Sequence, residues 1–280
     1  AEAMAAAGIP RLVLGAKEGV ALINGTAVSA GIGVLAWHDA RHLLAQAGIA
    51  LALSLEALRG FRDAFLPHLH AVRGHSGQAR VAAFVYRLVE GSELVRGDAD
   101  HDLDPAQGPP QDPYCLRAAP TVLGAGLDSL DHIERVLTTE INAVTDNPLI
   151  FLAGDGPLHL PRAIKAVSGG NFHGAPVGYV LDFLKIAVAD LASISERRTF
   201  MLTDGRLNRG LPPFLVAEPP GGEGLNNGLM MVQYTAASLV SENKVLAHPA
   251  SVDSIPSSAN REDHVSMSTI AARQAAQIVA

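Results

Sequence analysis

The sequence predicts a mainly α-helical protein whose core is a bundle of long helices. Its prolines leave long proline-free runs between them, and these runs are too long for strands. Apolar residues in 177–196 recur every three or four positions, which is the period of one helix face. No alternation of strand and helix patterns is visible, so a helical bundle is favoured.

The expected helices lie within six proline-free runs: 11–66, 68–104, 121–147, 177–211, 221–248 and 257–280. The clearest helical period lies in 177–196, where Val180 and Leu184 are predicted to face the core. Asp182 and Lys185 are expected on the opposite, polar side of the same helix.

The connections between these helices carry turn and loop signals. Asp-Asn-Pro and Gly-Asp-Gly-Pro in 141–161 favour one short hairpin. Two further passages, 99–113 and 204–227, read as long loops, and long loops in a compact helical domain are often functional.

Composition excludes several classes of protein. Of the 280 residues, 48% are hydrophobic and 18% are charged, with a mean hydropathy of +0.21, so a disordered chain is excluded. The net charge of −7 argues against a nucleic-acid partner, which needs a basic patch. The single cysteine, Cys115, excludes a disulfide framework and is expected to be a packing residue. We expect a globular, cytoplasmic protein.

The two ends of the sequence suggest a longer parent protein. The chain opens on an alanine-rich stretch without methionine, and 265–280 reads as a helix without a stop signal. We therefore expect residues 1–280 to be a single segment of one helical domain, truncated at both ends.

One stretch is long and apolar enough to cross a bilayer. Residues 19–37 carry no charge, but Asn24, Thr26 and Ser29 interrupt the stretch and no aromatic belt flanks it. A core helix buried on all sides in a soluble bundle is the favoured interpretation, and no membrane partner is predicted.

Short motifs that resemble cofactor or metal sites have simpler interpretations. Residues 31–36 match G-x-G-x-x-A, but no strand precedes them, so small residues at a close helix contact are favoured. His38 and His42 have the i, i+4 spacing of metal ligands, yet the charges between them favour a solvated helix end. His68 and His70 are similar, so no metal site is predicted. No G-x-S-x-G motif is present.

Several polar clusters interrupt this apolar chain. The first, LINGT (22–26), places an amide inside an otherwise apolar helix. The others are QDPYCLR (111–117), TDNP (145–148), SGGNFH (168–173) and SVDSIPSSANREDHVSM (251–267). Buried polar groups are costly unless they are paired, so together these clusters indicate a lined cavity.

In this order the clusters resemble the histidine and aromatic amino acid ammonia-lyases and the related aminomutases. The resemblance covers nearly the whole chain. It also includes KEGVALINGT (17–26), RGHSGQ (73–78), NAVTDNP (142–148), ISERR (194–198), GLPPFL (210–215) and a motif over 233–267. It implies a mainly α homotetramer whose active sites combine loops from several subunits.

The resemblance also implies an electrophilic cofactor. The family eliminates ammonia from an L-α-amino acid by means of a methylidene-imidazolone group, made by cyclisation of Ala-Ser-Gly. No such triplet occurs in these 280 residues, so we expect it upstream, with the tyrosine loop that supplies the base.

The family's functional residues have counterparts in this sequence. By resemblance, Asn24 binds the oxygen of the electrophile and Tyr114 assists proton transfer. Arg117 pairs with the substrate carboxylate, which a guanidinium binds through two parallel hydrogen bonds. The remaining counterparts hold the carboxylate and amine or line the pocket: Gln111, Asn147 and Phe172.

Glu262 suggests histidine as the substrate. Histidine-specific members have glutamate here and phenylalanine lyases have glutamine, and a carboxylate can pair with an imidazole. Alternatively, Glu262 is a first-turn acid of the last helix, with Ser257 or Ser258 as its cap. Arg261, where glutamine is usual, is a candidate ion-pair partner of Glu262.

The sequence therefore predicts an ammonia-lyase that converts L-histidine to urocanate, in a parent protein longer than this segment. Three alternatives stay open. The first is a tyrosine or phenylalanine ammonia-lyase, the second an aminomutase, and the third an inactive relative that acts as an assembly subunit.

Overall fold

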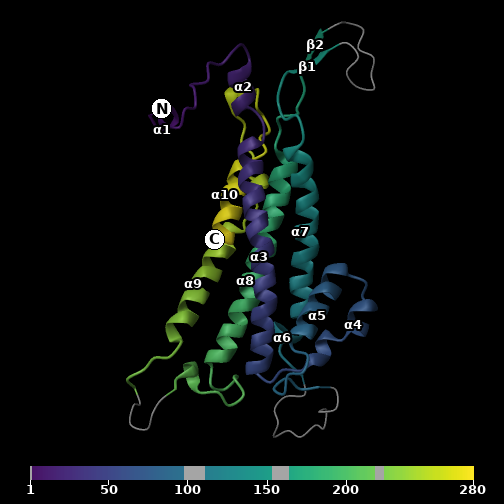
Figure 1. Ribbon diagram of the computed structural model, residues 1–280, viewed down its shortest axis with the longest axis vertical. Helices are drawn as coiled ribbons and strands as arrows, with labels where there is room; N and C mark the ends of the chain where they lie inside the picture. The colour runs from purple at the N-terminus through teal and green to yellow at the C-terminus, as the bar shows by residue number, and fades with distance from the viewer. Residues whose placement is uncertain (1, 98–110, 153–163, 218–223) are drawn as a thin grey trace.

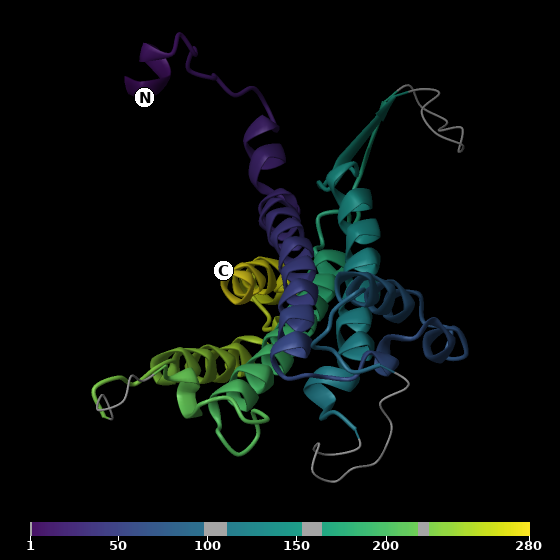
Figure 2. The same ribbon diagram turned by 60° about the horizontal axis from the view of Figure 1, so that its bottom comes forward.

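The computed structural model describes residues 2–97, 111–152, 164–217 and 224–280, and these form the predicted mainly α fold (Figure 1). A long bundle is built from α3 (Ala27–Ala57), α7 (Ala119–Ile141), α8 (Ala175–Thr203) and α10 (Ser268–Val279). Helix α5 (Ser76–Leu88) packs beside α7, and α9 (Met230–Leu246) runs outward from the base of α8 (Figure 2). The short helices are α1 (Glu2–Ala6), α2 (Glu18–Ile23), α4 (Pro67–Ala71) and α6 (Tyr114–Arg117). The 3₁₀ turns are Arg62–Phe65, Pro213–Leu215, Ala250–Val252 and Ser258–Asn260.

The predicted hairpin is present at one end of the bundle. Strands β1 (Leu149–Leu152) and β2 (Ile164–Val167) pair antiparallel, with Leu149 opposite Val167 and Leu152 opposite Ile164. The Gly-Asp-Gly-Pro turn signal between them lies outside the described residues, as does most of the predicted loop 99–113. Figure 1 shows the hairpin and α2 at the same end, opposite α4 and α6.

The core lies where α3, α7, α8 and α10 meet. Fully buried side chains come from all four helices, for example Leu51, Leu130, Leu181 and Ala275. Burying one leucine side chain contributes about 1.5–3 kcal/mol. Gly33 permits the contact between α3 and α8, because a Cβ there would lie 2.9 Å from Leu181 Cδ2. This confirms the close-contact interpretation for Gly33, whereas a Cβ at Gly31, the other glycine of the motif, would meet nothing within 4 Å.

Helix α8 corrects one prediction, because Asp182 and Lys185 are buried rather than solvated. Their side chains are 6% and 0% exposed, and Lys185 Nζ lies 2.8 Å from Asp182 Oδ1. The other face of α8 packs against the segment between α9 and α10. Asp182 accepts hydrogen bonds there from the backbone N–H groups of Ala250, at 3.0 Å, and Ser251, at 2.8 Å.

Lys185 ties the same segment to α10. Its Nζ donates to His248 O at 2.7 Å and to Gln274 Oε1 at 2.6 Å. Burial raises the pKa of Asp182, but the hydrogen bonds that it accepts outweigh burial and lower the pKa overall. This stabilisation is present above the unfolded pKa of about 3.9 and is lost as pH falls below it.

Helix α3 corrects a second prediction, because one of its sides is open in this chain. Leu35 is 68% exposed and Leu53 is 62% exposed. Residues Glu18–Ala57 contain the one described segment with the length and hydropathy to cross a membrane, and 28% of its most apolar window is buried. Core helices of soluble proteins have the same composition.

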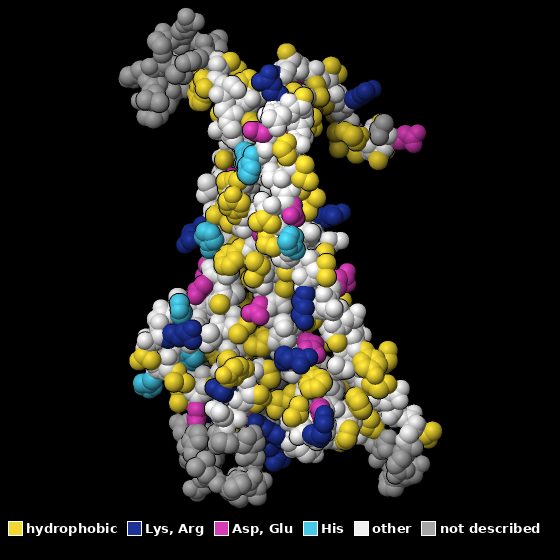
Figure 3. Space-filling model, turned by 180° about the vertical axis from the view of Figure 1, so that it is seen from behind, with side chains coloured by type: hydrophobic (Ala, Val, Ile, Leu, Met, Phe, Trp, Pro, Cys, Tyr) yellow, Lys and Arg dark blue, Asp and Glu magenta, His cyan; other side chains and the backbone are white. Residues whose placement is uncertain are grey.

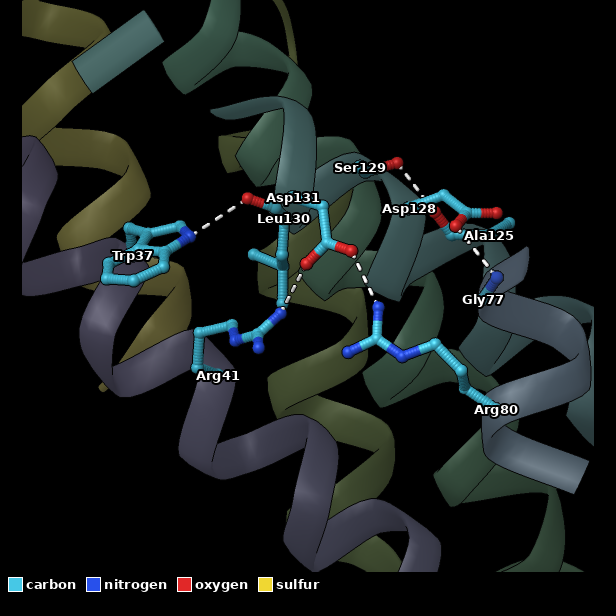
Figure 4. A network of polar contacts seen from close by, with 9 residues as sticks. All are labelled: Trp37, Arg41, Gly77, Arg80, Ala125, Asp128, Ser129, Leu130 and Asp131. Atoms are coloured by element: carbon cyan, nitrogen blue, oxygen red, sulfur yellow. Dashed lines mark hydrogen bonds and ion pairs between the residues drawn. The ribbon is translucent and has the colours of Figure 1, made fainter. Parts of the chain in front are cut away.

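Polar contacts join α3 to its neighbours in the bundle (Figure 4). Trp37 Nε1 donates to Leu130 O of α7 at 3.0 Å. Arg41 of α3 and Arg80 of α5 both pair with Asp131 of α7, at 2.6 and 2.7 Å. The central part of α3 is thus fixed against α5 and α7 by directional contacts as well as by apolar packing.

We expect Lys185→Met in the full-length protein to destabilise the fold by about 3–5 kcal/mol, because it leaves the buried Asp182 carboxylate without its cation. Lys244→Met, at an exposed position on α9, is the matched control and should change stability by less than about 0.5 kcal/mol. Thermal unfolding at neutral pH measures both. Equal midpoints for the two variants would contradict the stabilising role of the buried ion pair.

Candidate functional site

Asp146 joins two of the predicted site residues at the hairpin end of the bundle. Its Oδ1 accepts hydrogen bonds from Asn24 Nδ2 at 3.2 Å and from the backbone N–H of Asn147 at 2.7 Å. Its Oδ2 pairs with Lys17 Nζ. The hydrogen bond from Lys17, followed by that from Asn147, lowers the pKa of Asp146. Lys17 lies in KEGVALINGT and Asp146 in NAVTDNP, but no local pattern in either motif distinguishes these two residues from their neighbours.

The two loops that carry Asn24 and Asn147 are in direct contact. Gly25 has φ +103°, and a Cβ there would lie 1.8 Å from Thr145 O, so only glycine fits. The sequence predicted that Asn24 lies inside a helix. In the structure it instead follows the end of α2. The helical conformation is interrupted between α2 and α3, where Gly25 packs against the Thr145 carbonyl.

The loop 168–174, which carries Phe172, contacts the loop that carries Asn147 and the segment that contains Glu262. Gly169 N–H donates to Asn147 Oδ1 at 2.8 Å, and His173 Nε2 donates to His264 O at 3.0 Å. The rings of His173 and His264 are stacked with centroids 5.8 Å apart. Phe172, 36% exposed, lies in this loop between Gly169, which contacts Asn147, and His173, which contacts the segment that contains Glu262.

Glu262 closes a tight turn before α10. Its Oε2 accepts hydrogen bonds from Ser258 Oγ at 2.7 Å and Ser257 Oγ at 2.8 Å. These two bonds lower the pKa of the Glu262 carboxyl, the Ser258 bond most strongly. The alternative placement in the first turn of the last helix is wrong, because α10 begins at Ser268. The two serines bind Glu262 instead of capping that helix.

The candidate ion pair between Arg261 and Glu262 is absent from the described residues. Glu262 is exposed, and its carboxylate is oriented by uncharged hydroxyl groups. A carboxylate held in this way stays ionised at neutral pH and keeps its charge for a ligand.

The other three predicted site residues lie together around α6, at the opposite end of the bundle. Arg117 Nε donates to Asp112 O at 2.7 Å, and its guanidinium lies 4.6 Å from the centroid of the Tyr114 ring. Tyr114 is 70% exposed, and Gln111 is also exposed. This short segment therefore presents a phenol, a guanidinium and an amide at the surface of the chain.

A buried carboxylate anchors that segment. The Asp112 side chain is fully buried and accepts from Arg209 Nη2 at 2.6 Å and from Phe61 N–H at 2.7 Å. Arg209 Nη1 also donates to Leu58 O at 2.7 Å. Sequence reasoning missed Asp112 and Arg209, because their partners are distant in the sequence.

Beneath α6, Arg198 and Cys115 form a buried contact. Arg198 is 2% exposed and its Nη1 donates to Cys115 O at 3.3 Å. Burial lowers the pKa of Arg198 to about 10, and burial raises the pKa of the Cys115 thiol. A buried, protonated thiol is a poor nucleophile, so the packing role predicted for Cys115 is confirmed.

Within one chain the predicted site residues thus form two groups that do not meet. Tyr114 and Arg117 precede the start of α7, and Asn147 follows its end. The 23 residues of α7 span about 35 Å at 1.5 Å per residue. We call Asn24, Asn147, Phe172 and Glu262 the hairpin-end group, and Gln111, Tyr114 and Arg117 the α6 group.

Comparison with known proteins identifies relatives over the whole chain. The family model for aromatic amino acid lyases matches residues 1–280. The histidine ammonia-lyase of Caldanaerobacter subterraneus subsp. tengcongensis is 52% identical over 278 residues, which cover 99% of this chain and 51% of that protein. The histidine ammonia-lyase of Treponema denticola is 50% identical over 277 residues, covering 99% of this chain and 50% of that protein. The chain spans about half the length of these relatives.

Solved structures of a histidine ammonia-lyase and of a tyrosine aminomutase share the fold of this chain. The tyrosine aminomutase of Streptomyces globisporus matches with a TM-score of 0.88 and 38% identity, over 99% of this chain and 53% of that chain. The histidine ammonia-lyase of Trypanosoma cruzi matches with a TM-score of 0.82 and 43% identity, over 99% of this chain and 48% of that chain. The resemblance inferred from the motifs is confirmed, and this chain belongs to the aromatic amino acid lyase family.

Proposed function

We propose that the protein to which this chain belongs eliminates ammonia from L-histidine and releases urocanate. The observation that carries the proposal is the Glu262 carboxylate, which two serine hydroxyls orient and keep ionised at the hairpin end. An ionised carboxylate pairs with the N–H of an imidazole, whereas a phenyl ring offers it no partner. The relatives named histidine ammonia-lyase, at 50% and 52% identity, support the same substrate.

The hairpin-end group fits the methylidene-imidazolone cofactor that the family implies. An asparagine amide has two N–H donors, and Asp146 engages one of those of Asn24. We infer that the second donates to the oxygen of the cofactor, as in an oxyanion hole. When bound, the cofactor supplies the electrophile that makes the amino group a good leaving group. It is formed from Ala-Ser-Gly in a part of the parent protein outside this chain.

The side chains of the α6 group bind the amino acid and move a proton. Arg117 pairs with the substrate carboxylate, and the nearby aromatic ring of Tyr114 limits the directions in which the guanidinium can point. Tyr114 Oη exchanges a proton with the substrate. Gln111 and Asn147 hold the carboxylate and amine, and Phe172 lines the pocket beside the imidazole.

The two groups meet between copies of the chain in a homotetramer. Large apolar side chains are exposed along the helices, including Met231 and Leu239 on α9 and Phe183 on α8. Figure 3 shows exposed hydrophobic side chains among polar and charged ones along the length of one face. Surfaces of this kind on a single chain are typical of buried subunit interfaces. We place the enzyme in the cytoplasm without a membrane partner, and the net charge of −7 argues against a nucleic-acid partner.

The full-length protein should convert L-histidine faster than L-tyrosine or L-phenylalanine. Separate incubations, followed by the ultraviolet absorbance of the conjugated acrylate, measure the three rates. The absence of product from all three substrates would contradict ammonia elimination and favour the inactive assembly subunit.

Replacing Glu262 by glutamine in the full-length protein should lower kcat/KM for histidine by about 10–100-fold, because a charge-assisted hydrogen bond to the imidazole is lost. Turnover of an aromatic substrate should change much less. Glu90→Gln, at an exposed position beyond α5, is the matched control. Equal losses for histidine and for the aromatic substrate would remove the specificity argument.

Subunit complementation tests whether the two groups meet between copies. Asn24→Ala and Tyr114→Phe should each be nearly inactive alone. Co-expressed at equal levels, they should form mixed tetramers in which about a quarter of the sites combine an intact hairpin-end group with an intact α6 group. Recovered activity supports this arrangement, whereas none would mean that both groups of a site come from one chain.

An aminomutase is the second candidate, favoured by the TM-score of 0.88 to a tyrosine aminomutase. This reaction returns ammonia to the β-carbon instead of releasing it. Chromatography of the amino acids left after incubation with L-tyrosine distinguishes the two, because only a mutase yields the β-amino acid.

A further inference from the structure

Two histidines near the middle of α3 have the geometry of half a zinc site. The sequence suggested a solvated helix end for His38 and His42, but α3 continues to Ala57. Their Nε2 atoms are 3.3 Å apart and their ring centroids 4.6 Å. Two nitrogens bound at about 2.0–2.1 Å to one tetrahedral zinc are about 3.3–3.4 Å apart. The pair thus matches one edge of a zinc coordination tetrahedron.

A neighbouring carboxylate sets the proton position on one of these rings. Asp39 Oδ1 lies 3.2 Å from His38 Nδ1, and a carboxylate oxygen can only accept. His38 therefore donates from Nδ1, and in the neutral ring the lone pair lies on Nε2, the nitrogen that faces His42. A carboxylate that holds the second nitrogen of a ligand histidine is the usual outer shell of a protein zinc site.

The other two ligands are not supplied by the described part of this chain. No group of three or more His, Cys, Asp or Glu side chains that could hold a metal ion is found there. The same two residues of a second chain would complete the tetrahedron, provided that the histidine face of α3 can pack against its own copy.

The exposed stripe of α3 has the pattern of such a self-complementary face. Gly31, Leu35, Ala45 and Ile49 are exposed on the same side as the histidines, whereas Ala40, on the opposite side, is fully buried. Figure 1 shows α3 in front of α8, with its outer side uncovered. The exposed positions follow the a and d spacing of a heptad, which places them along one seam.

An antiparallel pairing about Ala40 brings these positions together in matched layers. His38 of one copy faces His42 of the other, Leu35 faces Ala45, and Gly31 faces Ile49. Large side chains therefore lie opposite small ones, and a Cβ at Gly31 would meet nothing within 4 Å in its own chain.

The charges near the histidine pair suit a divalent cation. Arg41 is paired with Asp131 of α7, as Figure 4 shows, so its charge is already compensated. Four neutral imidazoles leave the charge of the zinc ion uncompensated. The two Asp39 carboxylates, one from each copy, balance it from the outer shell.

We propose that His38 and His42 of two copies of this chain bind one zinc ion on the two-fold axis between antiparallel α3 helices. The site lies on the central part of α3 and is separate from the hairpin-end group and the α6 group. It fixes the register of the two helices, and its occupancy is measurable without an activity assay.

Zinc titration of the full-length protein, stripped with a chelator, tests the proposal. Competition with a chromophoric chelator should give one zinc per two chains. His38→Ala and His42→Ala should each weaken zinc binding by more than about 100-fold, and Asp39→Asn by about 10–100-fold. His132→Ala, at an exposed position on α7, should bind zinc like the wild type.

Cobalt substitution adds a direct readout of geometry, because tetrahedral Co²⁺ absorbs visible light much more strongly than octahedral Co²⁺. All four variants are at exposed positions, so each should retain its helical circular dichroism. A ratio of one zinc per chain, unchanged binding in both ligand variants, or no binding would each overturn the shared site.

Discussion

The length of α7 is the constraint on which the candidate site depends. The helix is continuous over 23 residues, so it holds the α6 group and the end of the Asn147 loop about 35 Å apart. No side-chain rearrangement closes such a distance, and a helix packed against α3, α5 and α8 does not bend enough to do so. If the two groups act on one substrate, they must come from different copies, and the rigidity of α7 makes the site a property of the assembly.

Carboxylates hold the functional segments in place at both ends of this rigid bundle. Asp112 binds a backbone N–H and Arg209 beneath the α6 group. Asp182 binds two backbone N–H groups before the Glu262 segment, and Asp146 joins Asn24 to Asn147. Burying a carboxylate is costly unless it is fully paired, so the buried Asp112 and Asp182 each favour one loop conformation. Asp146 is only partly buried and joins its two loops through the hydrogen bonds that it accepts. The side chains proposed to bind the substrate are exposed or partly exposed in the chain, and so remain available to a ligand.

The sequence predicted the helices, the hairpin and the family, because these follow from proline spacing, helical period and colinear motifs. The sequence-based predictions were wrong where the environment of a residue depends on which distant segment packs over it. Period places Asp182 on the side opposite Leu184, but only the fold shows that the α9–α10 connection covers that side. The break after Asn24 depends on the Thr145 carbonyl, which no local pattern near Asn24 reveals. The alternative interpretation of Glu262 as a first-turn helix acid was wrong, because serines before an acid resemble a cap in sequence but here bind the carboxylate itself.

One side of α3 is apolar and exposed in a single chain, and this bears on how copies of the chain assemble. The sequence predicted burial on all sides, whereas Leu35 and Leu53 are exposed in a single chain. A continuous exposed apolar stripe marks an interaction surface, and a partner that covers it removes Leu35 and Leu53 from water. A second copy is the simplest cover, because the stripe places small residues opposite large ones about its own centre. If a second copy covers this stripe, burial between subunits accounts for the hydropathy of Glu18–Ala57, which also satisfies the criterion for a membrane span.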